Sequence, residues 1–337
     1  MSRATKAGAI RAILVFALLL ALPFVFTDHW IVNIAFFGLM FAVLAVAWNL
    51  IGGYAGYIWL GSIAFFGLGA YALAITFQHV PLTSGYLPFF ALIPIGIAIG
   101  IVSIPLALLL LRVRAATFAV VSLAVLFVAE IFAFNLDGLT GGPQGLGMAL
   151  PPFVVTTFER PFYLAMLVLL AAVMFCSWYL AKSKFGLMLF AIKGDEDRAR
   201  GLGVRTTTVK VIAFALCCGF TGMAGGLWAY YITWIYPQFA MDPNTMFAII
   251  LMTYLGGKGT LWGPVLGAFL LAPAKEYFAY TLGGSAFYLI AYAALFLLVM
   301  FFLPRGVVPT VADFLARHRR RAAVLASGPR PAGEQVA

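Results

Sequence analysis

The stretch KSKFGLMLFAIKGDEDRARGLGVRTTTVK, from Lys182 to Lys210, is a polar segment between two long apolar runs. It holds ten of the chain's 21 basic and 11 acidic side chains, although only 9% of all residues are charged. The segment is compatible with a helix, and its charges have no reason to enter lipid. Such a segment between two membrane spans predicts a cytoplasmic surface on which another protein acts. A solvated connector without a partner is the alternative.

The composition indicates a membrane protein. Of the 337 residues, 64% are hydrophobic and 9% are charged, whereas soluble domains have about a quarter of their residues charged. Apolar stretches of about 18 residues or more recur, and each can cross the hydrocarbon core. Spanning segments must be helices or closed barrels, and these runs lack the alternation of barrel strands. We therefore predict an all-α, polytopic integral membrane protein with about ten transmembrane helices, some of them short or broken.

The expected spans are residues 10–27, 30–50, 57–78, 86–111, 115–135, 161–181, 209–235, 245–256, 263–282 and 286–303. The eighth is too short to cross as one straight helix, and the third and ninth are rich in glycine. With the N-terminus inside, all Lys and Arg except Arg160 and Lys275 fall on the cytoplasmic side, as the positive-inside rule requires. We expect both termini in the cytoplasm, a transmembrane domain over 1–309 with a cytoplasmic loop at 182–208, and a basic, disordered tail over 310–337.

The net charge of +10 does not indicate a nucleic-acid partner, because the basic residues lie between spans and at the termini. These residues are expected to meet membrane lipid instead. Cys176, Cys217 and Cys218 fall inside expected spans and have neither disulfide nor metal-ligand spacing. We expect them to pack as small apolar residues, and we expect no metal site.

Within the polar segment, Lys193 to Gly201 alternates in charge sign and is expected to form two turns of helix. Gly194 and Asp195 lie near the expected start, where an acidic residue suits the positive end of the helix dipole. Gly201 and Gly203 are expected to end the helix.

Other candidate positions lie in glycine-rich or ionisable stretches. The loop 136–160 carries LTGGPQGL, whose glycines and proline do not form a stable helix. It is either a gate element or a surface turn. The glycine-rich runs 49–72 and 254–272 indicate close helix packing or an internal repeat of a transporter. Glu130 is an acid deep in an expected span, which indicates a pathway role or a structural pair. The candidate pathway or gate residues are Asn49, Gly53, Gly56, Tyr57, Trp59, Ser62, Glu130, Thr140, Gly141 and Gly142.

Several sequence blocks occur in a specific order. They are 49–71, RVRAATFAVVSLAVLFVAEI at 112–131 followed by TGG, the block 185–214, GFTGMAGGLWA at 219–229, LGGKGTLWGPVLGA at 255–268 and FLPRGVVP at 302–309. With these blocks the chain resembles the permease subunit of ATP-binding-cassette importers for branched-chain amino acids, in the larger of two permease types. The resemblance covers about Asn49 to Pro309.

The resemblance implies a multi-pass protein of the bacterial inner membrane and a coupling helix over Lys193–Val204. A groove on a cytoplasmic ATPase would receive this helix. The implied partners are a homologous second permease, two ATPase subunits and an extracytoplasmic substrate-binding protein. The chain has no G-x-x-x-x-G-K-[ST] loop, so ATP and Mg²⁺ would be used by the partner ATPase, and the chain itself is expected to need no cofactor. The implied ATPase-coupling residues are Lys193, Gly194, Asp195, Glu196, Arg198, Ala199, Arg200, Gly201 and Leu202.

The chain departs from the family pattern after Gly56. Many relatives have GQLSLGHAAF there, whereas this sequence has the bulkier Tyr57 and Trp59 and then Ser62. Hydrophobic amino acids are the first substrate expected, with urea and short amides as the alternative. A stand-alone secondary transporter or channel would share the composition, but an intramembrane acid relay is missing. A membrane enzyme would need clustered acids, His or Cys at an interface, and the sequence has none.

Overall fold

The computed structural model describes residues 3–26, 28–79, 85–113, 115–154 and 157–282, with positions 294, 297, 301, 306–308 and 310. The expected span 286–303 and the expected tail 310–337 lie almost entirely outside these residues. The helices are α1 (Arg3–Val25), α2 (His29–Gly52), α3 (Ser62–His79), α4 (Leu87–Leu110), α5 (Ala115–Asn135), α6 (Asp137–Thr140), α7 (Glu159–Lys182), α8 (Lys184–Gly194), α9 (Glu196–Gly201), α10 (Thr206–Ile232), α11 (Pro237–Ala240), α12 (Pro243–Gly256) and α13 (Gly263–Leu282). A 3₁₀ turn, η1 (Gly142–Gln144), and two short strands, β1 (Leu146–Gly147) and β2 (Trp234–Ile235), complete the described part.

The prediction of an all-helical, polytopic membrane protein is confirmed. Within the described residues, a helix occupies each of the first nine expected ranges. Six stretches are long and apolar enough to cross a membrane, namely α2, α3, α4, most of α5, α7 and α10. The total of ten crossings stays a prediction.

The third helix begins later than the sequence predicts. Residues 57–61 are not helical, and α3 starts only at Ser62. The Leu60 amide donates to Ser122 Oγ of α5 at 3.0 Å, and Trp59 is completely buried. Non-helical backbone of this kind is tolerated at membrane depth because the surrounding protein satisfies it.

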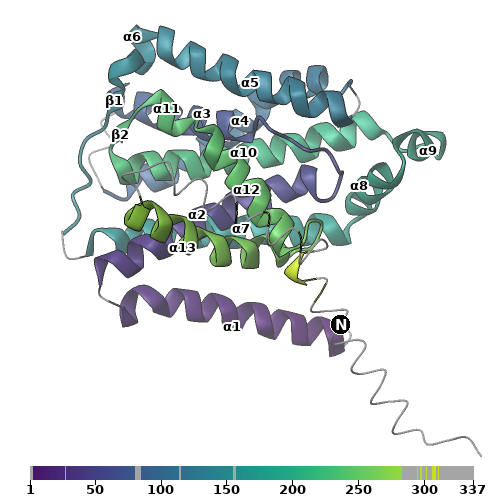
Figure 1. Cartoon of the computed structure of the whole chain (residues 1–337), viewed down its shortest axis with the longest axis horizontal. Coiled ribbons are helices and arrows are strands. Elements are labelled where there is room, and N and C mark those ends of the chain that lie inside the picture. The colour runs from purple at the N-terminus through teal and green to yellow at the C-terminus, as the bar shows by residue number, and fades with distance from the viewer. Residues whose placement is uncertain are drawn as a thin grey trace, which may run out of the picture.

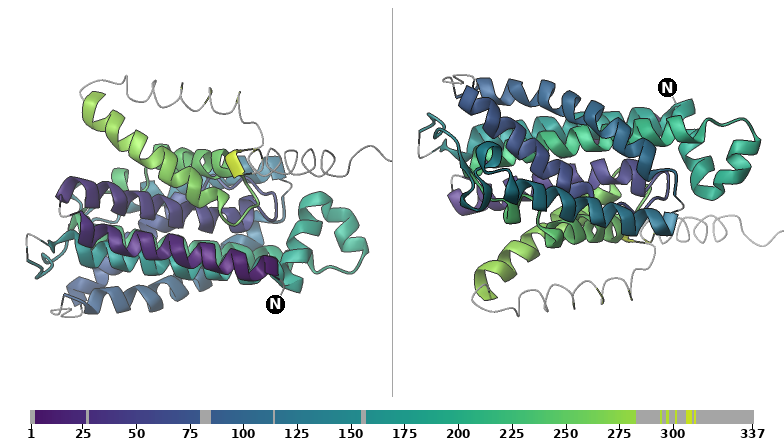
Figure 2. Two further views of the ribbon diagram at one scale, coloured as in Figure 1. Left: turned by 90° about the horizontal axis from the view of Figure 1, so that it is seen from below. Right: turned by 90° about the horizontal axis from the view of Figure 1, so that it is seen from above.

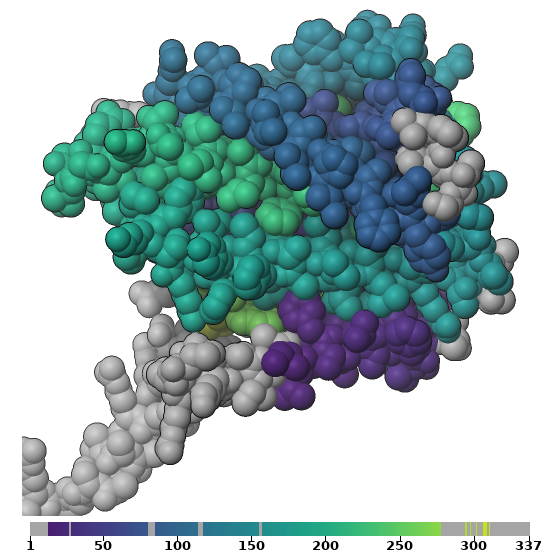
Figure 3. Space-filling view, turned by 180° about the vertical axis from the view of Figure 1, so that it is seen from behind, coloured from purple at the N-terminus to yellow at the C-terminus, as the bar shows by residue number. Residues whose placement is uncertain are grey.

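Helix α10 is the centre of the bundle and packs against α2, α3, α4 and α7 (Figure 1). Close approach is possible because small residues such as Gly222, Gly225 and Gly226 line its buried faces. On the face seen in Figure 3, α4 and α7 lie on either side of the visible part of α10, and α1 borders α7. Helix α5 lies at the opposite edge of the molecule from α1 (Figure 1).

The two ends of the bundle carry different structures. At one end α8 and α9 project beyond the long helices, and α1 begins near them (Figure 2). At the other end α6 and η1 lie beside a two-stranded antiparallel sheet, in which Leu146 pairs with Ile235 and Gly147 with Trp234 (Figure 1). The expected inside and outside loops therefore separate along the bundle axis. Which end faces the cytoplasm stays a prediction.

Accessibility labelling can assign these ends to the two sides of the membrane. Thr140 is buried, so we choose two equally exposed leucines, Leu150 (80% exposed) and Leu202 (84% exposed). In a chain with its native cysteines replaced, Leu202→Cys should react only with reagent on the cytoplasmic side and Leu150→Cys only from outside. Labelling of both positions from the same side would exclude the predicted topology.

Candidate functional site

The projecting α8 and α9, which we call the platform, are built by two side-chain caps. Ser183 Oγ accepts from the Gly186 amide at the start of α8. Asp195 Oδ1 accepts from the Arg198 amide at 3.0 Å and starts α9. Aspartate is a favoured N-cap because its carboxylate satisfies amides that have no partner within the helix. Gly203, with φ +85°, follows the end of α9.

One expectation for this segment is wrong. The sequence predicts one helix over 193–201, but Lys193 and Gly194 are the last residues of α8. The helix is interrupted at Asp195, where φ is −164° and ψ is 112°. A second helix then begins at Glu196. The break follows from the preference of Asp for the capping position, outside a helix, over an interior one. The predicted end at Gly201 is confirmed.

The outer surface of the platform is open and charged. Asp197, Arg198 and Arg200 are exposed, and Ala199 is the α9 side chain that is buried. A Cβ atom added at Gly194 or Gly201 would meet no other atom within 4 Å. The coupling residues named from the sequence therefore present a free surface, apart from Ala199, Glu196 and Lys193, whose ammonium bonds the Gly53 carbonyl.

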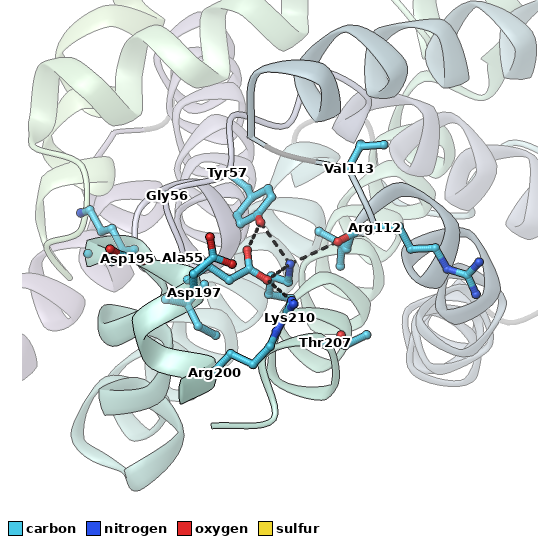
Figure 4. A pocket seen from close by; sticks show the side chains of 15 residues that line it. Ala55, Gly56, Tyr57, Arg112, Val113, Asp195, Asp197, Arg200, Thr207 and Lys210 are labelled. Atoms are coloured by element: carbon cyan, nitrogen blue, oxygen red, sulfur yellow. Dashed lines mark hydrogen bonds and ion pairs between the residues drawn. The ribbon is translucent and has the colours of Figure 1, made fainter. Parts of the chain in front are cut away.

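Glu196 turns inward and bonds Tyr57 and Lys210, which point toward each other in Figure 4. We call these three side chains the anchor cluster. Lys210 Nζ donates to Glu196 Oε1 at 2.6 Å and to the Tyr57 hydroxyl at 3.0 Å. It also donates to the Leu111 carbonyl at 3.2 Å. The Tyr57 hydroxyl donates to Glu196 Oε2. Glu196 therefore bonds Lys210 inside the protein, and its expected role as a partner-matching charge stays a prediction.

The charges of the anchor cluster are shielded from water. The Lys210 side chain is 2% exposed and the Glu196 side chain is 23% exposed. Removing one member of a buried ion pair typically costs about 3–5 kcal/mol, because the remaining charge loses its partner. The partial exposure of Glu196 places the expected cost at the lower end of that range. Exposed pairs such as Arg198–Asp195, with side chains 87% and 42% exposed, are worth about 0–1 kcal/mol.

The pKa of Glu196 is lowered. Burial alone would raise the pKa of this carboxyl, but the hydrogen bonds from Lys210 and Tyr57 favour the ionised form and outweigh it. The folded-state pKa therefore lies below the unfolded one. The contribution of Glu196 to stability is fully present above the unfolded pKa and is lost as pH falls through the lowered folded pKa. The anchor cluster thus persists at neutral and mildly acidic pH.

A second set of contacts joins the platform to the two glycine-rich turns. Lys193 Nζ donates to the Gly53 carbonyl at 2.8 Å. Asn49 bonds the other turn twice, because its Nδ2 donates to the Thr260 carbonyl at 3.0 Å and its Oδ1 accepts from the Gly259 amide at 2.8 Å. The turns within the glycine-rich runs 49–72 and 254–272 therefore pack against each other at the platform end of the bundle.

A polar cavity of about 570 Å³ lies between the platform and the bundle (Figure 4). The anchor cluster forms part of its wall, and Gly56, with φ +82°, lines it as well. Arg112 and Arg200 add two more cations. The cavity lies between one face of α9 and the ends of α4 and α10, so on this face α9 is held by specific side chains, whereas the buried Ala199 lies outside the cavity wall.

The ten candidate pathway residues do not form one site. Asn49, Gly53, Gly56 and Tyr57 lie at the platform end, as described above. Trp59 is buried against Phe214, with ring centroids 4.3 Å apart. Ser62 is 2% exposed, and its Oγ, like Trp59 Nε1, has no hydrogen-bond partner in the described part of the chain. The bulk of Trp59 therefore fills the protein core.

The remaining candidates lie toward the opposite end. Thr140 Oγ1 donates to the Ala133 carbonyl at 2.6 Å, and Gly141 and Gly142 both have positive φ. A Cβ at Gly142 would collide with the Asp137 carboxylate of α6 and lie 3.1 Å from the Phe134 carbonyl oxygen of α5, so the glycine turn packs tightly against both helices. Glu130 of α5 is partly buried. The assignment of these residues to a pathway stays a prediction.

An apolar groove of about 500 Å³ between α3 and α5 was not predicted. Thr140 lies in its wall, together with Tyr71. The Tyr71 hydroxyl is buried and has no hydrogen-bond partner among the described residues. The helical spacing of Leu68, Tyr71 and Ile75 on one face of α3 was the available signal, but it could not show that α5 stands opposite. No group of three metal-ligating side chains occurs within the described ranges.

Several named proteins match this chain over a large part of its length. LivM of Escherichia coli, a high-affinity branched-chain amino acid transport system permease protein, is 25% identical over 325 residues, which cover 88% of this chain and 74% of LivM. LivM of Salmonella typhimurium is 26% identical over 253 residues, which cover 66% of this chain and 58% of that protein. The match to the latter thus spans less than two thirds of the relative.

A relative with another name matches a shorter part. The autoinducer 2 import system permease protein LsrC of Salmonella paratyphi B is 34% identical over 137 residues, 40% of this chain and 38% of LsrC. No solved structure matches the chain. The family described as branched-chain amino acid transport system, permease component, matches residues 30–303, from the start of α2 to beyond α13. The chain belongs to this family of transport permeases.

Proposed function

We propose that this permease is the membrane subunit of an ATP-driven importer for branched-chain and other hydrophobic amino acids. In this proposal the chain forms half of a translocation pathway in the inner membrane, and a homologous second permease forms the other half. Of two cytoplasmic ATP-binding-cassette ATPases, one docks on the platform, and an extracytoplasmic binding protein delivers the substrate. The chain itself performs no ATP hydrolysis.

The observation that carries this proposal is the platform. It projects from the end of an apolar bundle, exposes charged side chains, and has open space at Gly194 and Gly201. Its two helices are fixed by caps and by the anchor cluster before any partner arrives. A preorganised surface loses less conformational entropy on binding. Exposed charges such as Arg198 and Arg200 would steer the ATPase and set its register.

The substrate class has two supports. The LivM relatives are named for branched-chain amino acids, and the groove between α3 and α5 is lined almost entirely by apolar side chains. A hydrophobic side chain gains free energy on entering such a groove. The bulky Tyr57 and Trp59 give no support for either substrate, because both are buried and pack inside the protein.

A transport assay with purified partners tests this function. The permease would be reconstituted with the second permease, the ATPases and the binding protein from its own gene neighbourhood. Uptake of leucine, isoleucine and valine should depend on ATP, whereas urea, short amides and autoinducer 2 should not be transported. Transport of one of the latter compounds alone would replace the substrate assignment. Uptake without ATP or the ATPases would show a secondary transporter instead.

A further inference from the structure

The covalent connection between α9 and α10 is a short link, residues 202–205, that contains Gly203 with φ +85°. The Val204 amide donates back to the Ala199 carbonyl at 3.1 Å, and Ala199 is buried, but the polar cavity lies between the face of α9 that carries Glu196 and the bundle. The Leu202 and Gly203 amides also donate to carbonyls of α9, so the link closes the end of that helix. On the cavity side, the connection between α9 and the bundle comes from side chains.

Lys210 supplies this connection because it joins three separate elements. It lies in the first turns of α10, and its ammonium group donates one hydrogen bond to α9 through Glu196, one to Tyr57 between α2 and α3, and one to Leu111 at the end of α4. Its three protons thus have three different acceptors. The ammonium also lies 4.8 Å from the centroid of the Tyr57 ring. This one side chain therefore connects α9, the segment between α2 and α3, and the end of α4.

The contacts continue from the anchor cluster into the bundle. The Tyr57 ring packs edge-on against Phe118 of α5, with centroids 5.3 Å apart. Three residues later, the Leu60 amide donates to Ser122 Oγ of α5. Helix α10, which carries Lys210, packs along α3 and α4. A shift of α9 would therefore reach both the central helix and α5.

We propose that Lys210 and Tyr57 are positioning residues that hold α9 through Glu196, so that α9 and the base of α10 move as one body. Lys210 is the junction, and Tyr57 extends it to α5. The mechanical part of this proposal concerns the permease alone. Its consequence for transport rests on the proposed function, in which an ATPase acts on the platform.

A distance measurement tests the mechanical part without any partner. Spin labels at Leu202 beyond α9 and Ile212 in α10, both exposed, would report how firmly the two helices are joined. A narrow distance distribution is expected in the parent protein. It should broaden or shift in Lys210→Met and remain narrow in Arg198→Met, which breaks the exposed pair with Asp195 of the same helix. Equal widths in both variants would overturn the proposal.

The reconstituted importer tests the consequence. Lys210→Met should retain the ATPases but lose about tenfold or more of its substrate-dependent uptake per ATP hydrolysed, because a shift of α9 would no longer reach α10 and coupling between two sites is typically worth about 5–150-fold. Adding Glu196→Gln should not increase the defect, because both changes remove one interaction. Lys210→Arg, which keeps the charge, should recover part of it. Additive defects, or parental uptake per ATP hydrolysed in Lys210→Met, would contradict the assignment.

Two controls separate the possible failures. If Lys210→Met does not fold, Tyr57→Phe and Glu196→Gln, which preserve side-chain shape, test the same anchor cluster with both readouts. The parent protein in the same assay tests the proposed function. If it binds no ATPase, the proposed function fails, and the spin-label result still decides whether the anchor cluster holds α9.

Discussion

Replacing Gly201 by tryptophan is expected to abolish ATPase binding while the permease itself folds normally. Gly201 is the last residue of α9, and a side chain added there meets no other atom of the chain within 4 Å. Surface changes of this kind usually alter stability by no more than about 0.5 kcal/mol. In the proposed complex, the ATPase groove closes on α9 and would have no room for an indole ring. We therefore expect at least about 100-fold weaker binding, a loss typical of a central interface position.

The measurement is the affinity of purified ATPase for the detergent-solubilised permease. Gly138→Trp is the matched control, because Gly138 has equally open surroundings but lies in α6 at the opposite end. Gly194→Trp should behave like Gly201→Trp. Alanine at Arg198 or Arg200 should have a small effect, since exposed charges mainly set association rate and register. ATPase binding by Gly201→Trp at parental strength would mean that α9 does not enter the partner.

The platform could be located from the sequence because charge is scarce in this chain. A polar run of this length between apolar runs has one physically reasonable place, outside the lipid. Its internal geometry could not be obtained in the same way. Whether Asp195 continues a helix or caps the next one depends on its backbone angles. The charge pattern is the same in both cases.

The inward turn of Glu196 was missed, although one signal for it was present. Lys210 lies inside the expected span 209–235, and a lysine there needs a counter-charge or another partner. Glu196 is fourteen positions away in the chain, and Tyr57 lies in a different loop. Choosing between Glu196 and its acidic neighbours requires the three-dimensional arrangement, because all of them occur in one short polar run.

For the glycine-rich blocks, the sequence likewise predicted one feature of the packing and left another open. Their interpretation as sites of close helix packing is consistent with the structure, where Gly69 of α3 and Gly222 of α10 approach through their backbones. The spacing of small residues predicts that such contacts exist. It does not say which helix is the neighbour, so the central position of α10 and the groove between α3 and α5 could not be predicted.

The second prediction with a large expected effect concerns the contact between α3 and α10. We expect Gly225→Ala to destabilise the permease strongly, because the new methyl group would collide with the Phe66 carbonyl oxygen. A backbone oxygen in a packed helix cannot rotate away as a side chain can, so the two helices must separate. Overpacking of this kind typically costs about 1–3 kcal/mol and sometimes more. The larger Gly225→Leu should prevent recovery of folded, monodisperse protein.

Gly38→Ala is the matched control, since Gly38 also lies within a long helix and its added methyl would stand 3.5 Å from the Phe269 ring, an ordinary contact. Alanine favours a helix over glycine by roughly 1 kcal/mol, so this variant should have an unchanged or raised Tm. Thermal unfolding in detergent compares the two. The propensity gain is common to both substitutions, and the difference in Tm therefore measures the collision at Gly225. Equal Tm values would mean that α3 and α10 lie farther apart than in the structure. The close packing of α10 against α3, which fixes the helix that carries Lys210, would then be absent.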